Sequence, residues 1–131
     1  MALDPGDLGD ATLAFLAESH LATLTLLRPD GTPHVTPVGF SYDVDARLAR
    51  IISWAGSQKY RYSSRPGGVP AALSQVDGGR WLTLEGTATA VTDPSRVAAA
   101  VMGYGERYSR PGEREDRIAI EIVVTRILGR G

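Results

Sequence analysis

Hydrophobic and polar residues alternate along several stretches of the chain, with the period of two that is typical of half-buried β-strands. In one example, isoleucines at positions 118, 120 and 122 are separated by Ala119 and Glu121. Alternation of this kind and runs rich in leucine, valine and threonine predict six strands. The predicted strands cover residues 21–28, 34–42, 48–54, 69–76, 80–91 and 118–122.

Turn sequences join four of these strands into two hairpins. Pro29-Asp30-Gly31 separates the first two strands, and Asp77-Gly78-Gly79 separates the fourth from the fifth. Both turns have glycine where a positive φ is expected. Pro33, just before the second strand, and Pro37, within it, donate no backbone hydrogen bond. We therefore expect this strand at a sheet edge, at a bulge or beneath a ligand.

Helical patterns are predicted at residues 8–20, after Gly56, and from Asp93-Pro94 onward. Hairpin-linked strands cannot form a doubly wound parallel sheet, so the predicted fold class is mainly β (α+β). The expected architecture is a six-stranded antiparallel barrel with short flanking helices. A barrel of this size is filled by its own side chains. A large planar ligand would therefore bind outside it, where two subunits meet.

Composition narrows the possible functions. The 131 residues are expected to form a single domain over positions 1–131. A net charge of −1 argues against binding to nucleic acid or an anionic membrane. The lack of cysteine excludes thiol catalysis, disulfides and cysteine-bound metals. Since no signal peptide or membrane-spanning run is recognisable, a soluble cytoplasmic protein is expected.

Common catalytic motifs are missing from the sequence. It contains no dinucleotide-binding glycine motif, phosphate loop or nucleophile elbow. His20 and His34 have no metal-ligand partner at helical spacing, so we interpret both as structural and predict no metal site. Glu85 and Glu121 could act as bases, but solvent-facing carboxylates on strands are the favoured interpretation. No catalytic residue is predicted.

Lys59 is the only lysine of the chain, and it follows Gly56-Ser57-Gln58 at a predicted helix start. Free backbone N–H groups and the positive end of the helix dipole favour an anion there. A hydroxyl, an amide and an ammonium group would together form a phosphate cradle. Taken alone, Lys59 could also be an ordinary solvated surface lysine.

Gln75 places an amide in an otherwise apolar strand, where an unpaired group would cost roughly 1–3 kcal/mol. The polar edge of a heterocycle would satisfy it. Arg80 and Trp81 lie at the mouth of the second hairpin. They could pack against their neighbours or stack on a planar ring.

These segments and their order resemble the pyridoxamine-phosphate-oxidase-like split β-barrel flavoproteins. The sequence is most similar to the actinobacterial branch that uses the deazaflavin coenzyme F-420, and there to its biliverdin-reductase-like members. The resemblance covers about residues 10–129. Its strongest pieces are Gly56-Ser57-Gln58-Lys59, Ser74-Gln75-Val76-Asp77-Gly78, Arg80-Trp81-Leu82 and Leu84-Glu85-Gly86.

The resemblance implies a homodimer with two cofactor sites in grooves between its subunits. The cofactor phosphate would lie on Ser57, Gln58 and Lys59, and its ring over one strand. The resemblance implies that the ring lies over Thr36, Pro37 and Val38. Ser53 and Gln75 would help to hold the cofactor, and Arg80 and Trp81 would lie near its edge. Many relatives have an arginine where this chain has Ser57. The phosphate is therefore held with less charge, or Arg61 or Arg65 completes the grip.

The implied activity is hydride transfer from reduced F-420 to a conjugated small-molecule acceptor, for which biliverdin is the most specific candidate. The alternatives are an FMN-dependent oxidoreductase on the same scaffold, or a non-catalytic carrier of flavin or haem. Because one fold supports many functions, the fold alone does not separate them.

Overall fold

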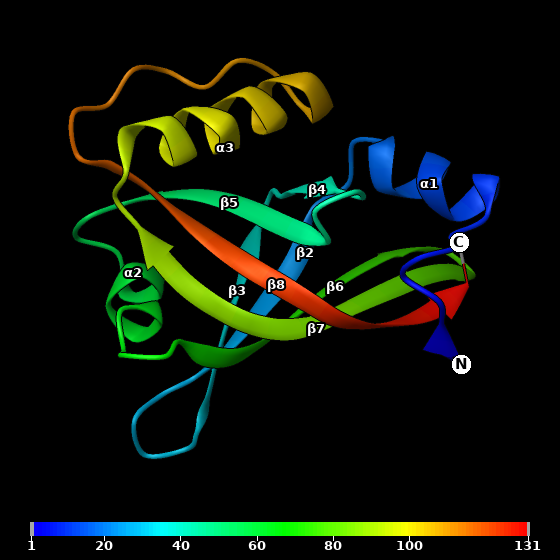
Figure 1. The fold of residues 1–131 in the computed structure, drawn as a ribbon, viewed down its shortest axis with the longest axis horizontal. Helices are drawn as coiled ribbons and strands as arrows, with labels where there is room; N and C mark the ends of the chain where they lie inside the picture. Colours follow the sequence, from blue (N-terminus) through cyan, green and yellow to red (C-terminus); the bar gives the residue numbers. More distant parts are fainter. Residues whose placement is uncertain (1, 131) are drawn as a thin grey trace.

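The computed structural model describes residues 2–130, which form one antiparallel sheet and three helices (Figure 1). The helices are α1 (Asp10–Ala17), α2 (Gln58–Ser63) and α3 (Pro94–Arg107). The strands are β1 (Ala2–Leu3), β2 (Ala22–Leu27), β3 (Pro33–Val38), β4 (Ser41–Asp43), β5 (Leu48–Trp54), β6 (Val69–Asp77), β7 (Arg80–Val91) and β8 (Arg117–Arg130).

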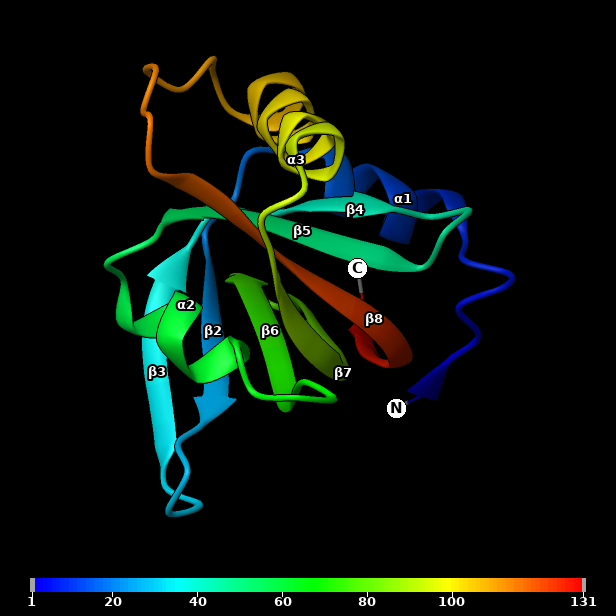
Figure 2. The same ribbon diagram turned by 60° about the vertical axis from the view of Figure 1, so that its left-hand side comes forward.

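The sheet curls strongly but does not close. Its order is β3-β2-β6-β7-β8-β5-β4, with β1 paired to β8, so β3 and β4 form its two ends. Both predicted hairpins are confirmed as β2–β3 and β6–β7. The edge position expected from Pro33 and Pro37 is confirmed too, because β2 is the one strand that β3 pairs with in the described part of the chain. Figures 1 and 2 show α3 lying over the part of the sheet that contains β4, β5 and β8.

The predicted count of six strands is wrong, because the sheet formed by the described residues has eight. The predicted strand 34–42 is divided at Gly39 and Phe40 into β3 and β4. The pair β1–β8, Ala2 opposite Leu128, had no recognisable pattern in the sequence. The last strand runs to Arg130 rather than to position 122. Beyond position 122 the alternation is interrupted, because the register with β7 shifts between Glu85 and Gly86 and leaves both Thr125 and Arg126 exposed.

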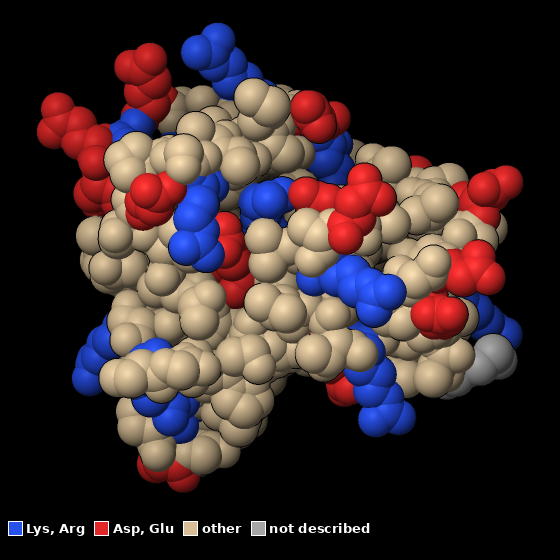
Figure 3. Space-filling view, viewed as in Figure 1, with Lys and Arg blue, Asp and Glu red and all other residues tan. Residues whose placement is uncertain are grey.

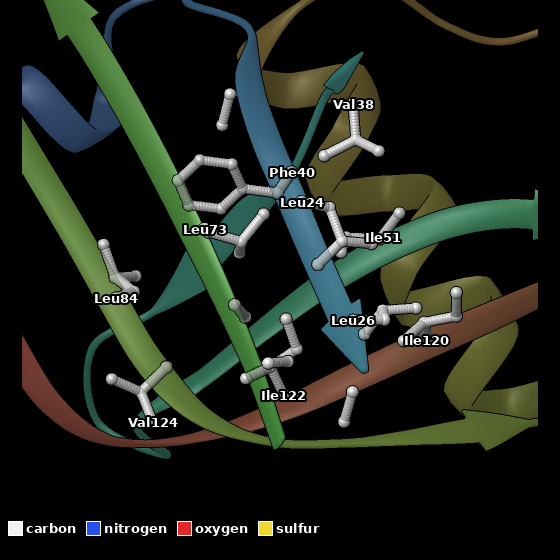
Figure 4. Close-up of a cluster of buried hydrophobic side chains, with 14 of the residues drawn as sticks. Leu24, Leu26, Val38, Phe40, Ile51, Leu73, Leu84, Ile120, Ile122 and Val124 are labelled. Carbon is white, nitrogen blue, oxygen red and sulfur yellow. The ribbon is translucent and has the colours of Figure 1, made fainter. Parts of the chain in front are cut away.

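The core lies inside the curl of the sheet and is filled by side chains of six strands and α1 (Figure 4). Leu24 of β2, Leu73 of β6 and Ile122 of β8 are fully buried there. Burial of a large aliphatic side chain stabilises the fold by about 1.5–3 kcal/mol. This filling confirms that the inside of the sheet is a packed core.

A smaller apolar cluster joins α3 to the outer face of the sheet. Val97 and Ala100 of α3 pack with Val91 and Ala119. The helix begins as the sequence predicts: the Asp93 carboxylate accepts a hydrogen bond of 3.1 Å from the Arg96 backbone N–H, and a proline follows the cap.

The expectation that Glu121 faces solvent is wrong. Its side chain is 6 % exposed, and its carboxylate accepts hydrogen bonds from the Arg96 guanidinium, one of them 3.1 Å long. The reason is tertiary, because α3 covers this part of β8. Glu85 keeps the more open position that the sequence predicts, 3.9 Å from Arg126. Over the described residues, none of the helices is long and apolar enough to cross a membrane.

A bulge at Gly86 of β7 lets β8 approach closely, and this position should tolerate no side chain. A Cβ there would lie 1.9 Å from the backbone O of Val123, which cannot move aside. We predict that Gly86→Ala lowers the free energy of unfolding by about 1–3 kcal/mol, measured by urea denaturation. The control Gly112→Ala has no heavy atom within 4 Å and should change stability by less than about 0.5 kcal/mol. Equal stability of the two variants would contradict the close approach.

Candidate functional site

A small pocket of about 310 Å³ lies where β3, β5, α2 and the chain after α3 meet. Three residues proposed from the sequence line it: Pro37, Val38 and Lys59. Its other lining residues are Gly39, Ile52, Tyr104, Ser109, Pro111 and Arg117. The pocket therefore unites the predicted ring strand with the predicted phosphate-binding lysine, and adds Arg117 as a second cation.

Lys59 is partly buried, and this burial lowers the pKa of its ammonium group. Its Nζ lies 5.3 Å from the centroid of the Trp54 ring. In residues 2–130, no carboxylate lies within 4.0 Å of it. Removing a cation from water without an opposite charge is unfavourable. These features favour an anion site over an ordinary solvated lysine.

Ser57 and Ser53 lie behind this lysine and are both buried. Ser57 is the N-cap of α2, since its Oγ accepts a 3.1 Å hydrogen bond from the Tyr60 backbone N–H. The same Oγ accepts a 2.8 Å bond from the Ser53 hydroxyl. Both hydroxyls thus hold the start of the helix that carries Lys59. Gln58 is exposed and Thr36 is partly buried. Direct contact of these residues with a cofactor stays a prediction.

The Gln75 amide has partners within the chain. Its Nε2 donates a 3.1 Å hydrogen bond to the Phe15 backbone O, and its Oε1 accepts a 2.8 Å bond from Arg107 Nη2. The expectation that this amide needs a ligand is therefore wrong. The sequence analysis missed Arg107 as the partner of Gln75. Arg107 belongs to α3, 32 positions away along the chain, and no residue near Gln75 indicates the contact.

Arg80 joins the β6–β7 turn to α1. Its guanidinium bonds to both carboxylate oxygens of Glu18, at 2.9 and 3.1 Å, and to Asp77 at 2.6 Å. It also lies 4.4 Å from the centroid of the Phe15 ring. The sequence left open whether Arg80 packs against its neighbours or stacks on a planar ring, and the structure favours contact with its neighbours.

Arg80 and Trp81 lie far from Lys59 within one chain. In the sheet register, Trp81 pairs with Arg130 at the end of β8, whereas Trp54, beside Lys59, pairs with Arg117 at its start. Figure 1 shows α2 and the β6–β7 turn at opposite ends of the molecule. The predicted cofactor contacts therefore divide into two groups that a single chain does not bring together.

The comparisons with known proteins identify the family. Residues 8–131 match the family model described as pyridoxamine 5'-phosphate oxidase. The chain belongs to this family. The likeness extends over nearly the whole sequence and confirms the family that the motifs indicated.

One curated member of the family is 48% identical to this chain over 122 residues, which cover 93% of this chain and 88% of the relative. It is an F-420H2-dependent biliverdin reductase of Mycobacterium tuberculosis (strain CDC 1551 / Oshkosh). A solved F-420 reductase has a TM-score of 0.72 and 25% identity, and covers 92% of this chain and 98% of its own. A conserved hypothetical protein of M. tuberculosis has a TM-score of 0.76 and 24% identity, over 95% of this chain and 85% of its own, which shows the fold.

In this pyridoxamine 5'-phosphate oxidase family member, the two hydrogen bonds between Arg80 and Glu18 should make the free energy of unfolding depend on pH in the acid range. Hydrogen bonds from Arg80 and then from His20 lower the pKa of Glu18 from 4.5 to about 2. A carboxyl whose pKa falls on folding stabilises the protein above its unfolded pKa, and that contribution disappears as the pH falls through the folded pKa.

We therefore predict that Glu18→Gln unfolds at lower urea concentration than the parent protein at pH 6. The difference between their midpoints should shrink as the pH falls from about 4.5 to about 2. Glu113→Gln, which removes an exposed carboxylate of the loop after α3, serves as the matched control. A difference that stays constant over this pH range would contradict the assignment.

Proposed function

We propose that this protein is an oxidoreductase that uses reduced coenzyme F-420 to reduce a conjugated small-molecule acceptor, with biliverdin as the most specific candidate. The structural observation that carries the proposal is the partly buried Lys59 ammonium, which has no carboxylate within 4.0 Å and lines a pocket with Pro37 and Val38. The relative with 48% identity supplies the chemistry of this proposal.

The residues of the pocket fit the cofactor by the chemistry of their donors. The Lys59 ammonium would donate a charge-assisted hydrogen bond to the cofactor phosphate. Ser53 and Ser57 would support that contact by holding the start of α2, and Gln58 is exposed beside it. When bound, reduced F-420 supplies the hydride.

The strand that would carry the ring suits a flat ligand. Within residues 2–130, β3 pairs with β2 alone, which leaves its other edge open, and Pro37 has no N–H that would be left unpaired under a ring. We propose that Thr36, Pro37 and Val38 contact the ring at this edge. The chain would then orient the cofactor and exclude water from one side of it, without a protein nucleophile.

The acceptor has room beside the cofactor pocket. A larger pocket of about 620 Å³ lies between α3 and the following loop, and it shares Pro111 and Arg117 with the smaller one. Arg110 and Arg114 also line it, together with Glu113 and Glu115. Figure 3 shows acidic and basic side chains intermixed over this loop at the upper left. We propose that Arg110 and Arg114 hold the carboxylates of the acceptor. Arg80, at the other end of the chain, would contribute only from a second subunit.

Acceptor-dependent oxidation of reduced F-420 tests this function. We expect the purified protein to reoxidise reduced F-420 when biliverdin is added, and to do so much more slowly without it. Absorbance of the oxidised deazaflavin measures the rate. Reduced FMN is the matched alternative donor. A rate that is equal or faster with FMN would favour the FMN-dependent alternative, and no oxidation with either donor would favour a carrier.

We further propose that the protein is a homodimer joined through the outer face of the sheet. Small side chains, including Thr25, Ala72 and Thr125, line a groove of about 400 Å³ on this face. Val35, paired with Thr25 in the register, is 57% exposed, and Val76, on the same face of β6 as Ala72, is 67% exposed. Apolar residues on a flat, exposed face are typical of a surface that another chain covers.

A dimer would also bring the two groups of predicted cofactor contacts together, because Trp81 at the far end of one subunit could approach the Lys59 pocket of the other.

We predict that light scattering gives twice the mass of the chain, and that Ala72→Arg gives monomers with weakened F-420 binding. Ala11→Arg, on the exposed side of α1, is the control. A monomeric parent protein that binds F-420 with full affinity would overturn this proposal.

A further inference from the structure

We infer that Arg117 is the second cation of the Lys59 pocket and binds the same anionic group, the phosphate of the cofactor. This inference rests on the proposed function, because it takes the ligand of the pocket to be a phosphate ester. It adds a binding residue from the last strand, which neither the motifs of the sequence nor the comparisons assign.

Sheet pairing places Arg117 beside α2 although 57 residues separate it from Lys59 along the chain. Arg117 begins β8 and pairs with Trp54, the last residue of β5. The Lys59 ammonium lies 5.3 Å from the ring centroid of the same Trp54. Lys59 and Arg117 both line the 310 Å³ pocket, and no aspartate or glutamate is among its lining residues.

The hydrogen bonds of Arg117 leave most of its donors available. A guanidinium carries five N–H groups, and within residues 2–130 that of Arg117 has a single hydrogen-bond partner, the backbone O of Gly112. Its neighbour Arg114 is instead paired with the Asp116 carboxylate at 2.5 Å. The bond to Gly112 orients the Arg117 side chain, and the remaining donors can bind a ligand oxygen.

Two cations that line one pocket without a lining carboxylate suit an anionic ligand. An anion bound between them would gain a charge-assisted hydrogen bond from each. A guanidinium also fits the paired oxygens of a phosphate. The Ser109 side chain lines the same space and offers a neutral donor.

The expectation that Arg61 or Arg65 supplies the missing charge finds no support. Arg65 donates through Nη2 to the Leu27 backbone O, and it does not line the pocket. Arg61 follows Lys59 by two positions, and residues at that spacing lie on different sides of a helix. Its side chain is near the Tyr62 ring, 5.9 Å from the centroid. We therefore assign to Arg117 the additional phosphate contact that the sequence analysis expected from Arg61 or Arg65.

Phosphate is present in both F-420 and FMN, so the test must separate the phosphate from the ring. We would measure equilibrium binding of three probes by fluorescence: F-420, FMN and the deazaflavin riboside that lacks the phosphate. The proteins are the parent, Arg117→Gln, Lys59→Gln, the double variant and Arg117→Lys. Arg47→Gln, which removes an exposed arginine of the β4–β5 turn, is the matched control.

We expect Arg117→Gln and Lys59→Gln each to weaken F-420 binding by about tenfold to a hundredfold, as for loss of a charge-assisted hydrogen bond. Arg117→Lys should recover part of the loss. The double variant should lose less than the product of the two single effects, because both cations bind one group. Binding of the phosphate-free riboside and the melting temperature of the free protein should stay unchanged, and Arg47→Gln should match the parent protein in all of these measurements.

Arg117→Gln that binds F-420 as the parent does, while Lys59→Gln binds weakly, would overturn this inference and leave the proposed function intact. Equal weakening of the riboside, or a melting temperature lowered by several degrees, would also overturn it, because Arg117 would then be a structural residue. If the parent protein binds FMN but not F-420, the proposed function fails, and the FMN measurements decide the role of Arg117 alone.

Discussion

The buried guanidinium of Arg107 is the contact on which the arrangement of the chain depends. Arg107 comes from the last turn of α3 and donates hydrogen bonds of 2.8 Å each to the backbone O atoms of Glu18 and Phe40 and to Gln75 Oε1. Burial lowers the pKa of this arginine, so the charged form is held against a desolvation cost. A buried cation is tolerated when its donors are satisfied, and here the acceptors come from α1, the β3–β4 corner and β6.

This constraint reaches the candidate site through the β3–β4 corner. The Tyr108 hydroxyl accepts a 3.1 Å bond from the Phe40 backbone N–H and donates to the His20 backbone O at 2.6 Å. At the same corner, Gly39 packs so tightly against α3 that a Cβ there would lie 2.8 Å from the Tyr104 ring. The end of β3, where Val38 lines the pocket, is therefore fixed by α3. The pocket walls are positioned by contacts that lie outside the pocket.

The sequence predicted best what depends on neighbouring residues. The β2–β3 and β6–β7 hairpins follow from local turn residues, and α3 begins at the Asp93 cap as expected. Lys59 stood out because it is a single lysine beside a helix start. Arg107, Glu121 and Arg117 could not be placed in the same way, because their partners are set by the packing of α3 and by strand pairing. Gln75 was noticed for a sound reason, an amide in an apolar strand, but its partner comes from 32 positions away.

Whether a cation has a nearby carboxylate or other oxygen acceptors separates the structural cations of this chain from the candidate binding cations. Arg80 and Arg96 face carboxylates that hold elements together, and Arg107 has three oxygen acceptors. Lys59 and Arg117 have no such carboxylate among the described residues, although both line one pocket. The net charge of −1 for the whole chain does not weaken a site for one phosphate, because such a site is governed by the charges that line it. What the fold contributes is a packed interior that leaves this site at the edge of the sheet, where a ligand and a second subunit could both reach it.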